Sequence, residues 1–276
     1  MNQNQLKILQ ECEKDALAVF YNYCKNNDIS FFLRGGSVLG AIKYKDIVPW
    51  DDDIDVLIPR NDYDKLLKIC DSNISDKYLF ISYKNTKNAH CYFPRILLKE
   101  NYRKQYNFPK NNERGLVLID VLPLDGMPKN KLILKVHIFK AKLLRLLASI
   151  WTYEIKETVS MHSSSNDKII GFLHKVKIHR LYKQDTIYQK MDKLYSKYVY
   201  GKTYNAGTMA SSKMEKEIME YSIWDKGTTK KFGDMEYLVP LKYDLYLKKL
   251  FGEDYMTREP SIKEKNKSHI LGSCNK

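Results

Sequence analysis

Residues 34–60 read RGGSVLGAIKYKDIVPWDDDIDVLIPR, and the pattern in this stretch decides the fold. The apolar segment 29–33 before it is typical of a β-strand, and Gly35-Gly36 ends that strand. Ser37 is expected to cap a short helix. A second strand is expected at 54–58. The predicted order is strand, glycine turn, short helix and strand.

Aspartates alternate with apolar residues at the start of the second predicted strand. Because successive side chains of a strand point to opposite faces, Asp53 and Asp55 share one side. Neighbouring carboxylates repel each other unless a cation lies between them, and magnesium prefers oxygen ligands. It also keeps positions open for substrate phosphates. We therefore predict a divalent-cation site at Asp53 and Asp55. Asp51 and Asp52 are each expected to cap a backbone N–H, to pair with Lys45 or to support the metal ligands.

A third carboxylate, Asp120, lies within the apolar segment 116–122, which is expected to be a strand that ends at Pro123. If this strand neighbours the one at 54–58, Asp120 joins the other two aspartates and can accept the proton of an attacking hydroxyl. The alternative is a buried salt bridge. Arg95 is expected either to reach a phosphate or to lie on the surface.

The glycine turn is suited to an anion. Glycine lets a backbone approach a phosphate closely, and the N–H groups of Gly36 and Ser37 lie at an expected helix start. Arg34 adds a positive charge. We therefore predict that Arg34, Gly35, Gly36 and Ser37 bind the phosphates of a donor substrate.

These segments together resemble known proteins. The order of strand, Gly-Gly-Ser turn, helix and Asp-x-Asp strand is similar to the polymerase-beta-like nucleotidyltransferases. Residues 34–60 resemble the signature of the LicD family, which includes fukutin-related members. Residues 119–128 (IDVLPLDGMP) resemble its second motif, and residues 239–255 (VPLKYDLYLKKLFGEDY) its C-terminal motif. The resemblance is thin between residues 130 and 220. The chain departs from the family at Lys43-Tyr44-Lys45-Asp46, where Arg-His-Lys-Gly is expected.

The resemblance implies an α+β fold, with a polymerase-beta-like nucleotidyltransferase core of a small mixed sheet and helices, and a mainly helical second half. It implies a phosphotransferase that moves phosphocholine, or a related phospho-alcohol, from CDP-choline or another CDP-alcohol to a hydroxyl of a cell-surface glycan precursor, releasing CMP. The glycan would belong to lipopolysaccharide, teichoic acid or capsule. Magnesium or manganese would be the cofactor, and Asp53, Asp55 and Asp120 would be the metal-binding and catalytic residues.

The chain is expected to divide near residue 128, after Asp125-Gly126, which reads as a turn. Residues 1–128 would form the catalytic core and residues 129–276 a helical extension packed on it as one unit. Residues 129–151 form a basic amphipathic pattern, with one apolar face. We expect that face to pack into the core; the alternative is peripheral contact with the inner membrane surface. The residues of this face are Leu132, Val136, Phe139, Leu143, Leu146 and Ile150.

Composition and charge indicate which partners, which cysteine state and which cellular location to expect. The net charge of +14 suits an anionic partner, but the lysines are diffuse and no nucleic-acid-binding motif is present, so no specific nucleic acid is expected. Five cysteines, with no metal-ligand spacing, are expected to be reduced thiols. The N-terminal residues lack a signal-peptide pattern and no apolar stretch is long enough to span a bilayer, so we expect a cytoplasmic protein, or one peripheral to the cytoplasmic face of the membrane.

Two competing functions remain at this stage. A nucleotide-sugar glycosyltransferase also uses Asp-x-Asp with a metal, but it usually carries a nucleotide-binding unit before that motif, and only about fifty residues precede it here. A non-catalytic glycan-binding protein would leave the three carboxylates without a purpose.

Overall fold

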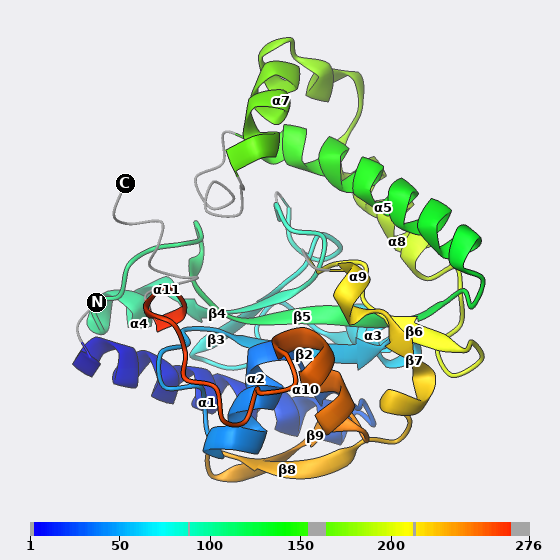
Figure 1. Cartoon of the computed structure of the whole chain (residues 1–276). Coiled ribbons are helices and arrows are strands. Elements are labelled where there is room, and N and C mark those ends of the chain that lie inside the picture. The colour runs from blue at the N-terminus through cyan, green and yellow to red at the C-terminus, as the bar shows by residue number, and fades with distance from the viewer. Residues whose placement is uncertain (1–2, 88, 154–163, 212–213, 266–276) are drawn as a thin grey trace.

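The computed structural model describes residues 3–87, 89–153, 164–211 and 214–265 (Figure 1). Its strands form one mixed sheet, in the order β3-β4-β5-β2-β1-β9-β8, with β6 paired to β5 and β7 paired to β6. Two pairs are parallel, β2 with β5 and β1 with β9. The expected mixed sheet with helices is therefore confirmed. The strands are β1 (Phe32–Leu33), β2 (Ile54–Pro59), β3 (Tyr78–Ile81), β4 (Arg95–Lys99), β5 (Gly115–Met127), β6 (Asn205–Gly207), β7 (Met219–Glu220), β8 (Thr228–Phe232) and β9 (Met235–Val239).

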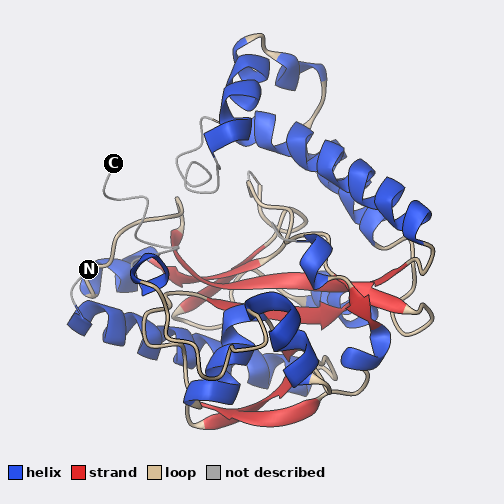
Figure 2. Cartoon of the chain, viewed as in Figure 1, coloured by secondary structure: helices blue, strands red, loops and turns tan. Residues whose placement is uncertain are grey.

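Helices lie on both sides of this sheet (Figure 2). In Figure 1, α1 follows one side, whereas α5, α7 and α8 form a group on the other. The helical elements are α1 (Gln3–Asn26), α2 (Gly35–Leu39), the π-helical turn η1 (Gly40–Tyr44), α3 (Arg60–Ile69), α4 (Glu100–Gln105), α5 (Lys131–Thr152), α7 (Ser164–Lys175), η2 (Ile178–Leu181), α8 (Gln184–Tyr195), α9 (Met214–Glu217), η3 (Tyr221–Ile223), α10 (Tyr243–Phe251) and α11 (Ile262–Lys265).

The N-terminal helix covers the strands that carry the candidate site. Its apolar residues recur at three- and four-residue intervals, which places them on one face. This face is buried and packs against β4 and β5. Leu17 and Phe20 are fully buried within it. The helix therefore supports the sheet through its apolar face.

Strand β5 is longer than predicted. We expected it to stop at Pro123, but it continues to Met127. Proline lacks a backbone N–H, yet Pro123 lies opposite Ile58 in the ladder with β2, and residues beyond it pair with β6. The predicted turn at Asp125 is therefore wrong, because β6 supplies that segment with a pairing partner.

The second half of the chain contributes to the sheet. Strands β6 and β7 extend it beyond β5, and β9 pairs with β1 through Phe32 and Leu238. We expected helices here and did not predict β6, β7, β8 or β9. Residues on both sides of position 128 therefore build one sheet.

Helix α5 presents the opposite face to the one we predicted. Its buried residues include His137, Ile138 and Ala141, and it packs against α8. The predicted apolar face is largely exposed, as at Leu132 and Phe139. The helix carries apolar residues on two faces, and the face with the smaller side chains makes the closer packing. The expectation that the larger apolar face enters the core is wrong over most of its length.

Within the described ranges, the structure contains no helix that is both long and apolar enough to cross a bilayer. The thiols of Cys12, Cys24, Cys70 and Cys91 are free, whereas Cys274 lies outside the described residues.

Candidate functional site

Two of the predicted aspartates face each other across neighbouring strands. Strands β2 and β5 run parallel, and Asp55 lies directly opposite Asp120 in their register. Both side chains are about one-fifth exposed, with values of 23% and 22%. The strand arrangement on which the prediction for Asp120 depended is therefore present. This register places the two carboxylates side by side, and each is partly exposed to solvent.

Asp53 lies in the loop just before β2, close enough to Asp55 and Asp120 for their charges to act on it. Burial raises its pKa well above the usual range, and the charges of Asp55, Asp51, Asp52 and Asp120 add to that effect. Burial likewise raises the pKa of Asp55 to about 7, although the Arg34 guanidinium opposes the shift. Both shifts report that negative charge at this place is unfavourable without a cation. The residues therefore fit a divalent cation with oxygen ligands.

The loop Asp51-Asp52-Asp53 is itself compact. One carboxylate oxygen from each residue lies within 4.8 Å of the others. Asp52 is buried, whereas Asp51 and Asp53 are partly exposed. Asp51 and Asp52, which we predicted to support the metal ligands, thus lie next to Asp53. Buried Glu13 of α1 also has a raised pKa, caused by burial and then by Asp52 and Asp51.

Arg34 bridges Asp55 to the second half of the chain. Its Nη1 donates to Asp55 Oδ2 at 2.7 Å, and its Nε donates to Glu217 Oε2 at 2.8 Å. Nη2 donates to Ser211 Oγ at 2.9 Å and also contacts Glu217. The residue predicted to contact a donor phosphate is thus held by two carboxylates. It lies beside the predicted metal ligands.

Arg95 pairs with Asp120 of β5, as Arg34 pairs with Asp55 of β2. It lies opposite Asp120 on β4, and its Nε donates to Asp120 Oδ1 at 3.0 Å. Its side chain is buried, with 8% exposure. The salt bridge that we considered as the alternative for Asp120 is therefore present. Each strand carboxylate of the site has one arginine beside it.

The Gly-Gly-Ser turn packs directly on the carboxylates. Gly35 has φ +53°, a left-handed conformation that glycine adopts without strain. A Cβ on Gly36 would lie 2.6 Å from Asp51 Oδ2. Ser37 does not cap the helix, because α2 begins at Gly35 and the Ser37 Oγ accepts the backbone N–H of Asp55 at 3.1 Å. The turn therefore needs small residues to place the aspartates, in addition to any approach of a phosphate.

Three functional neighbours escaped the sequence analysis, namely Ser211, Glu217 and Tyr246. Glu217 and Ser211 are buried and hold the Arg34 guanidinium. Tyr246 of α10 accepts the Gly35 N–H at 2.9 Å through its hydroxyl. Tyr246 lies within residues 239–255, the segment that resembles the C-terminal motif of the family, and it is fully buried. No local pattern marks Glu217, since its partner is 183 residues away.

A buried ion pair supports the far ends of the same two strands. Arg60 donates to both oxygens of Asp125, at 2.6 and 2.9 Å, and to Asp192 of α8 at 2.8 Å. Asp125 is fully buried. The residue expected in a turn therefore joins β5, α3 and α8 instead.

The residues that depart from the family pattern, Lys43 to Asp46, lie in the segment before the aspartate loop. Tyr44 packs edge-on against Trp50, with ring centroids 5.8 Å apart. The Lys43 ammonium donates to the carbonyl of Arg258 at 3.0 Å. Asp46 accepts from Lys14 at 3.2 Å. These contacts fix the loop that leads into the aspartates.

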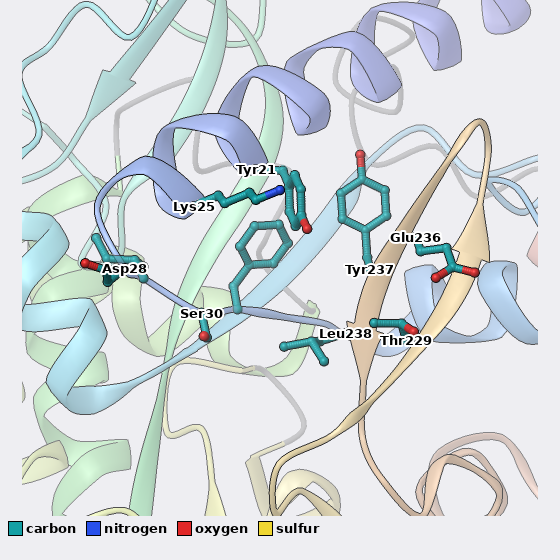
Figure 3. Close-up of a pocket in the computed structure, with 10 residues that line it drawn as sticks. Tyr21, Lys25, Asp28, Ser30, Thr229, Glu236, Tyr237 and Leu238 are labelled. Carbon is teal, nitrogen blue, oxygen red and sulfur yellow. The ribbon is translucent and has the colours of Figure 1, made fainter.

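A small cavity of about 240 Å³ lies elsewhere, between the end of α1 and strand β9 (Figure 3). Tyr21, Lys25, Tyr237 and Glu236 are among its lining residues. None of the predicted site residues lines it. We assign it no role in the chemistry.

Comparison with known proteins agrees with this geometry. Residues 28–141 match the family model described as LicD/FKTN/FKRP, nucleotidyltransferase domain. The match includes β2, β5 and the three predicted metal aspartates. Over this segment the chain is similar to the LicD family. The matched residues end within α5, so Glu217 and Tyr246 lie beyond the part that the LicD model covers.

Individual proteins also match parts of the chain. Lipopolysaccharide cholinephosphotransferase LicD of Haemophilus influenzae is 42% identical over 53 residues, which is 19% of this chain and 20% of that protein. Uncharacterized protein RP689 of Rickettsia prowazekii is 24% identical over 131 residues, or 38% of this chain and 48% of that protein. Uncharacterized protein RT0683 of Rickettsia typhi is 31% identical over 64 residues, or 21% of each chain. The chain thus spans between a fifth and a half of the length of these relatives.

Proposed function

We propose that this protein transfers phosphocholine, or a related phospho-alcohol, from a CDP-linked donor to a hydroxyl of a glycan, releases CMP, and acts in the cytoplasm. The observation that carries the proposal is the pairing of Asp55 with Asp120 across β2 and β5, with Asp53 beside them, inside the LicD-matched segment. The name of the Haemophilus relative supports phosphocholine as the cargo and lipopolysaccharide as the acceptor class.

The fold is part of the same proposal. Strands β1, β2 and β5, with α2 between the first two, would correspond to a polymerase-beta-like nucleotidyltransferase core. The description of the matching family supports this correspondence. The Asp55 and Asp120 register is the arrangement that this correspondence requires.

Asp53, Asp55 and Asp120 would hold magnesium or manganese, because they offer oxygen ligands in a place where negative charge is already unfavourable. Bound there, the metal would neutralise the charge of the donor phosphates. Asp51 and Asp52 would orient Asp53. Arg34 and Arg95 are held beside the aspartates and would add positive charge for the phosphates.

The bond changes are those of an in-line displacement. The acceptor hydroxyl oxygen forms a bond to the phosphorus that carries the alcohol, and the bond from that phosphorus to the bridging oxygen breaks. CMP leaves with the bridging oxygen and its electron pair. The hydroxyl proton passes to a carboxylate of the site, for which we propose Asp120. The Gly35-Gly36-Ser37 turn would lie against the donor phosphates.

The test is CMP release from CDP-choline with magnesium and an envelope glycan as acceptor. Wild type is compared with Asp53→Asn and with the control Asp76→Asn, since Asp76 is an exposed aspartate away from β2 and β5. We expect acceptor-stimulated release that chelation and Asp53→Asn abolish and that Asp76→Asn leaves unchanged. The assay is repeated with CDP-ribitol and CDP-glycerol, because these carry related alcohols. No release from any of the three donors would refute the proposal.

A further inference from the structure

Helices α5 and α7 and the turn η2 display large apolar side chains to solvent. Along α5 these lie at intervals of four, three and four residues, which places them on one face. That face is opposite the side that packs on α8. Phe139 is 68% exposed, Phe172 of α7 is 64% exposed and Leu181 of η2 is 83% exposed. The exposed apolar residues of this region, called the apolar face below, are Leu132, Ile133, Val136, Phe139, Leu143, Ile169, Phe172, Val176 and Leu181.

Positive charge borders the apolar face. Helix α5 contains lysines and an arginine but no aspartate or glutamate. At 3.6 residues per turn, Lys135 and Lys142 follow one side of its apolar row and Lys140 follows the other. These lysines are exposed. Lys175 and Lys177 continue the basic border beside α7.

We propose that the apolar face docks on an anionic lipid surface. An interfacial helix combines an apolar stripe, which enters the boundary between headgroups and acyl chains, with lysines that contact anionic headgroups. Lys135 and Lys140 supply that charge complementarity, whereas Lys142 is paired with Glu215. A second copy of this chain is a poorer occupant, since a two-fold contact through the same face would place lysines against lysines.

Docking in this way would hold the candidate site near the lipid surface. Arg145 of α5 donates to the carbonyl of Ser211, and the Ser211 hydroxyl accepts from Arg34. The helix that carries the apolar face is therefore connected to Asp55 by three successive contacts, the last of which joins Arg34 to Asp55. The inference itself rests on the surface of α5, α7 and η2 and does not depend on the proposed reaction.

The test is co-sedimentation with vesicles of phosphatidylcholine alone and with vesicles that also contain phosphatidylglycerol. We expect binding to the anionic vesicles that weakens as salt rises, because salt screens the lysines. Phe139→Glu should weaken binding about tenfold or more, and so should the double variant Lys135→Gln/Lys140→Gln.

Matched controls use the same chemistry elsewhere on the surface. Ile8→Glu changes an apolar side chain of α1 that is 44% exposed, and Lys65→Gln/Lys68→Gln removes two exposed lysines of α3. Both controls should bind as the wild type does, and circular dichroism checks that every variant is folded. Absence of binding to anionic vesicles, or equal loss in controls and test variants, would overturn the proposal. So would a wild-type dimer in analytical ultracentrifugation that Phe139→Glu converts to a monomer without any vesicle binding.

Discussion

Replacing Arg34 by methionine should strongly destabilise the protein, because it leaves Glu217 buried without its cation. The Arg34 side chain is 12% exposed and that of Glu217 is 5% exposed. Removing one partner of a buried ion pair costs about 3–5 kcal/mol, since the other charge remains desolvated. Asp55, which is 23% exposed, keeps some hydration and adds less. We therefore expect Arg34→Met to lower the free energy of unfolding by about 3–5 kcal/mol.

Urea unfolding of a double-mutant cycle measures the interaction itself. The double variant Arg34→Met/Glu217→Gln removes both charges, so it should cost less than the sum of the single variants, with a coupling of about 2 kcal/mol. The control is Lys142–Glu215, an exposed pair in which the two side chains are 57% and 61% exposed. Its coupling should stay below about 1 kcal/mol. Equal coupling in the two cycles would refute the reasoning that Arg34 is a buried bridge between β2 and the second half.

Three further variants test separate contacts. Gly35→Ala should lower the free energy of unfolding by about 1–2 kcal/mol in urea titration, because φ +53° is left-handed; an unchanged midpoint would contradict this. Tyr246→Phe removes the acceptor of the Gly35 N–H, so it should cost about 1 kcal/mol and reduce CMP release, and full activity would show that this contact does not place the turn. His137→Phe tests acid stability: burial, with Lys197 and Lys140 nearby, lowers the His137 pKa from 6.5 to about 4. As pH falls from 6.5 to 4, His137 therefore takes up a proton in the unfolded chain before it does so in the folded protein. Over this range the free energy of unfolding of wild type should fall by about 3 kcal/mol relative to that of the variant. Parallel stability curves for wild type and variant would exclude that role for His137.

Local sequence patterns were sufficient to predict that Asp55 and Asp120 lie on strands. The apolar residues that alternate with Asp55 mark β2, and the apolar neighbours of Asp120 mark β5, whereas Asp53 lies in the loop before β2. Both are local patterns that depend on backbone periodicity alone. The pairing of β2 with β5 then brought Asp55 and Asp120 together.

What the sequence did not predict depends on contacts between distant residues. The Arg34–Glu217 contact joins residues 183 apart, and no local spacing marks it. Strands β6 and β7 have three and two residues, too few for a period to appear. Pro123 was read as a stop, although pairing with β2 carries the strand through it. A proline does not end a strand when the residues on both sides of it are paired with neighbouring strands, as those around Pro123 are.

Helix α5 shows a different limit. Its sequence has apolar residues on two faces, and periodicity does not say which face meets the rest of the protein. Ala141 and Ala148 allow close approach of α8, whereas Phe139 and Leu132 remain exposed. The larger apolar face was therefore assigned to the wrong environment.

The central claim is that a metal-dependent site on β2 and β5 transfers phosphocholine as one unit. The most direct test uses CDP-choline that is labelled both in the choline and in the phosphorus attached to it, with magnesium and glycan acceptor. We expect both labels to enter the glycan in the ratio they have in the donor, and chelation or Asp53→Asn to prevent this. Glycan that carries neither label, or equal labelling by wild type and Asp53→Asn, would contradict it.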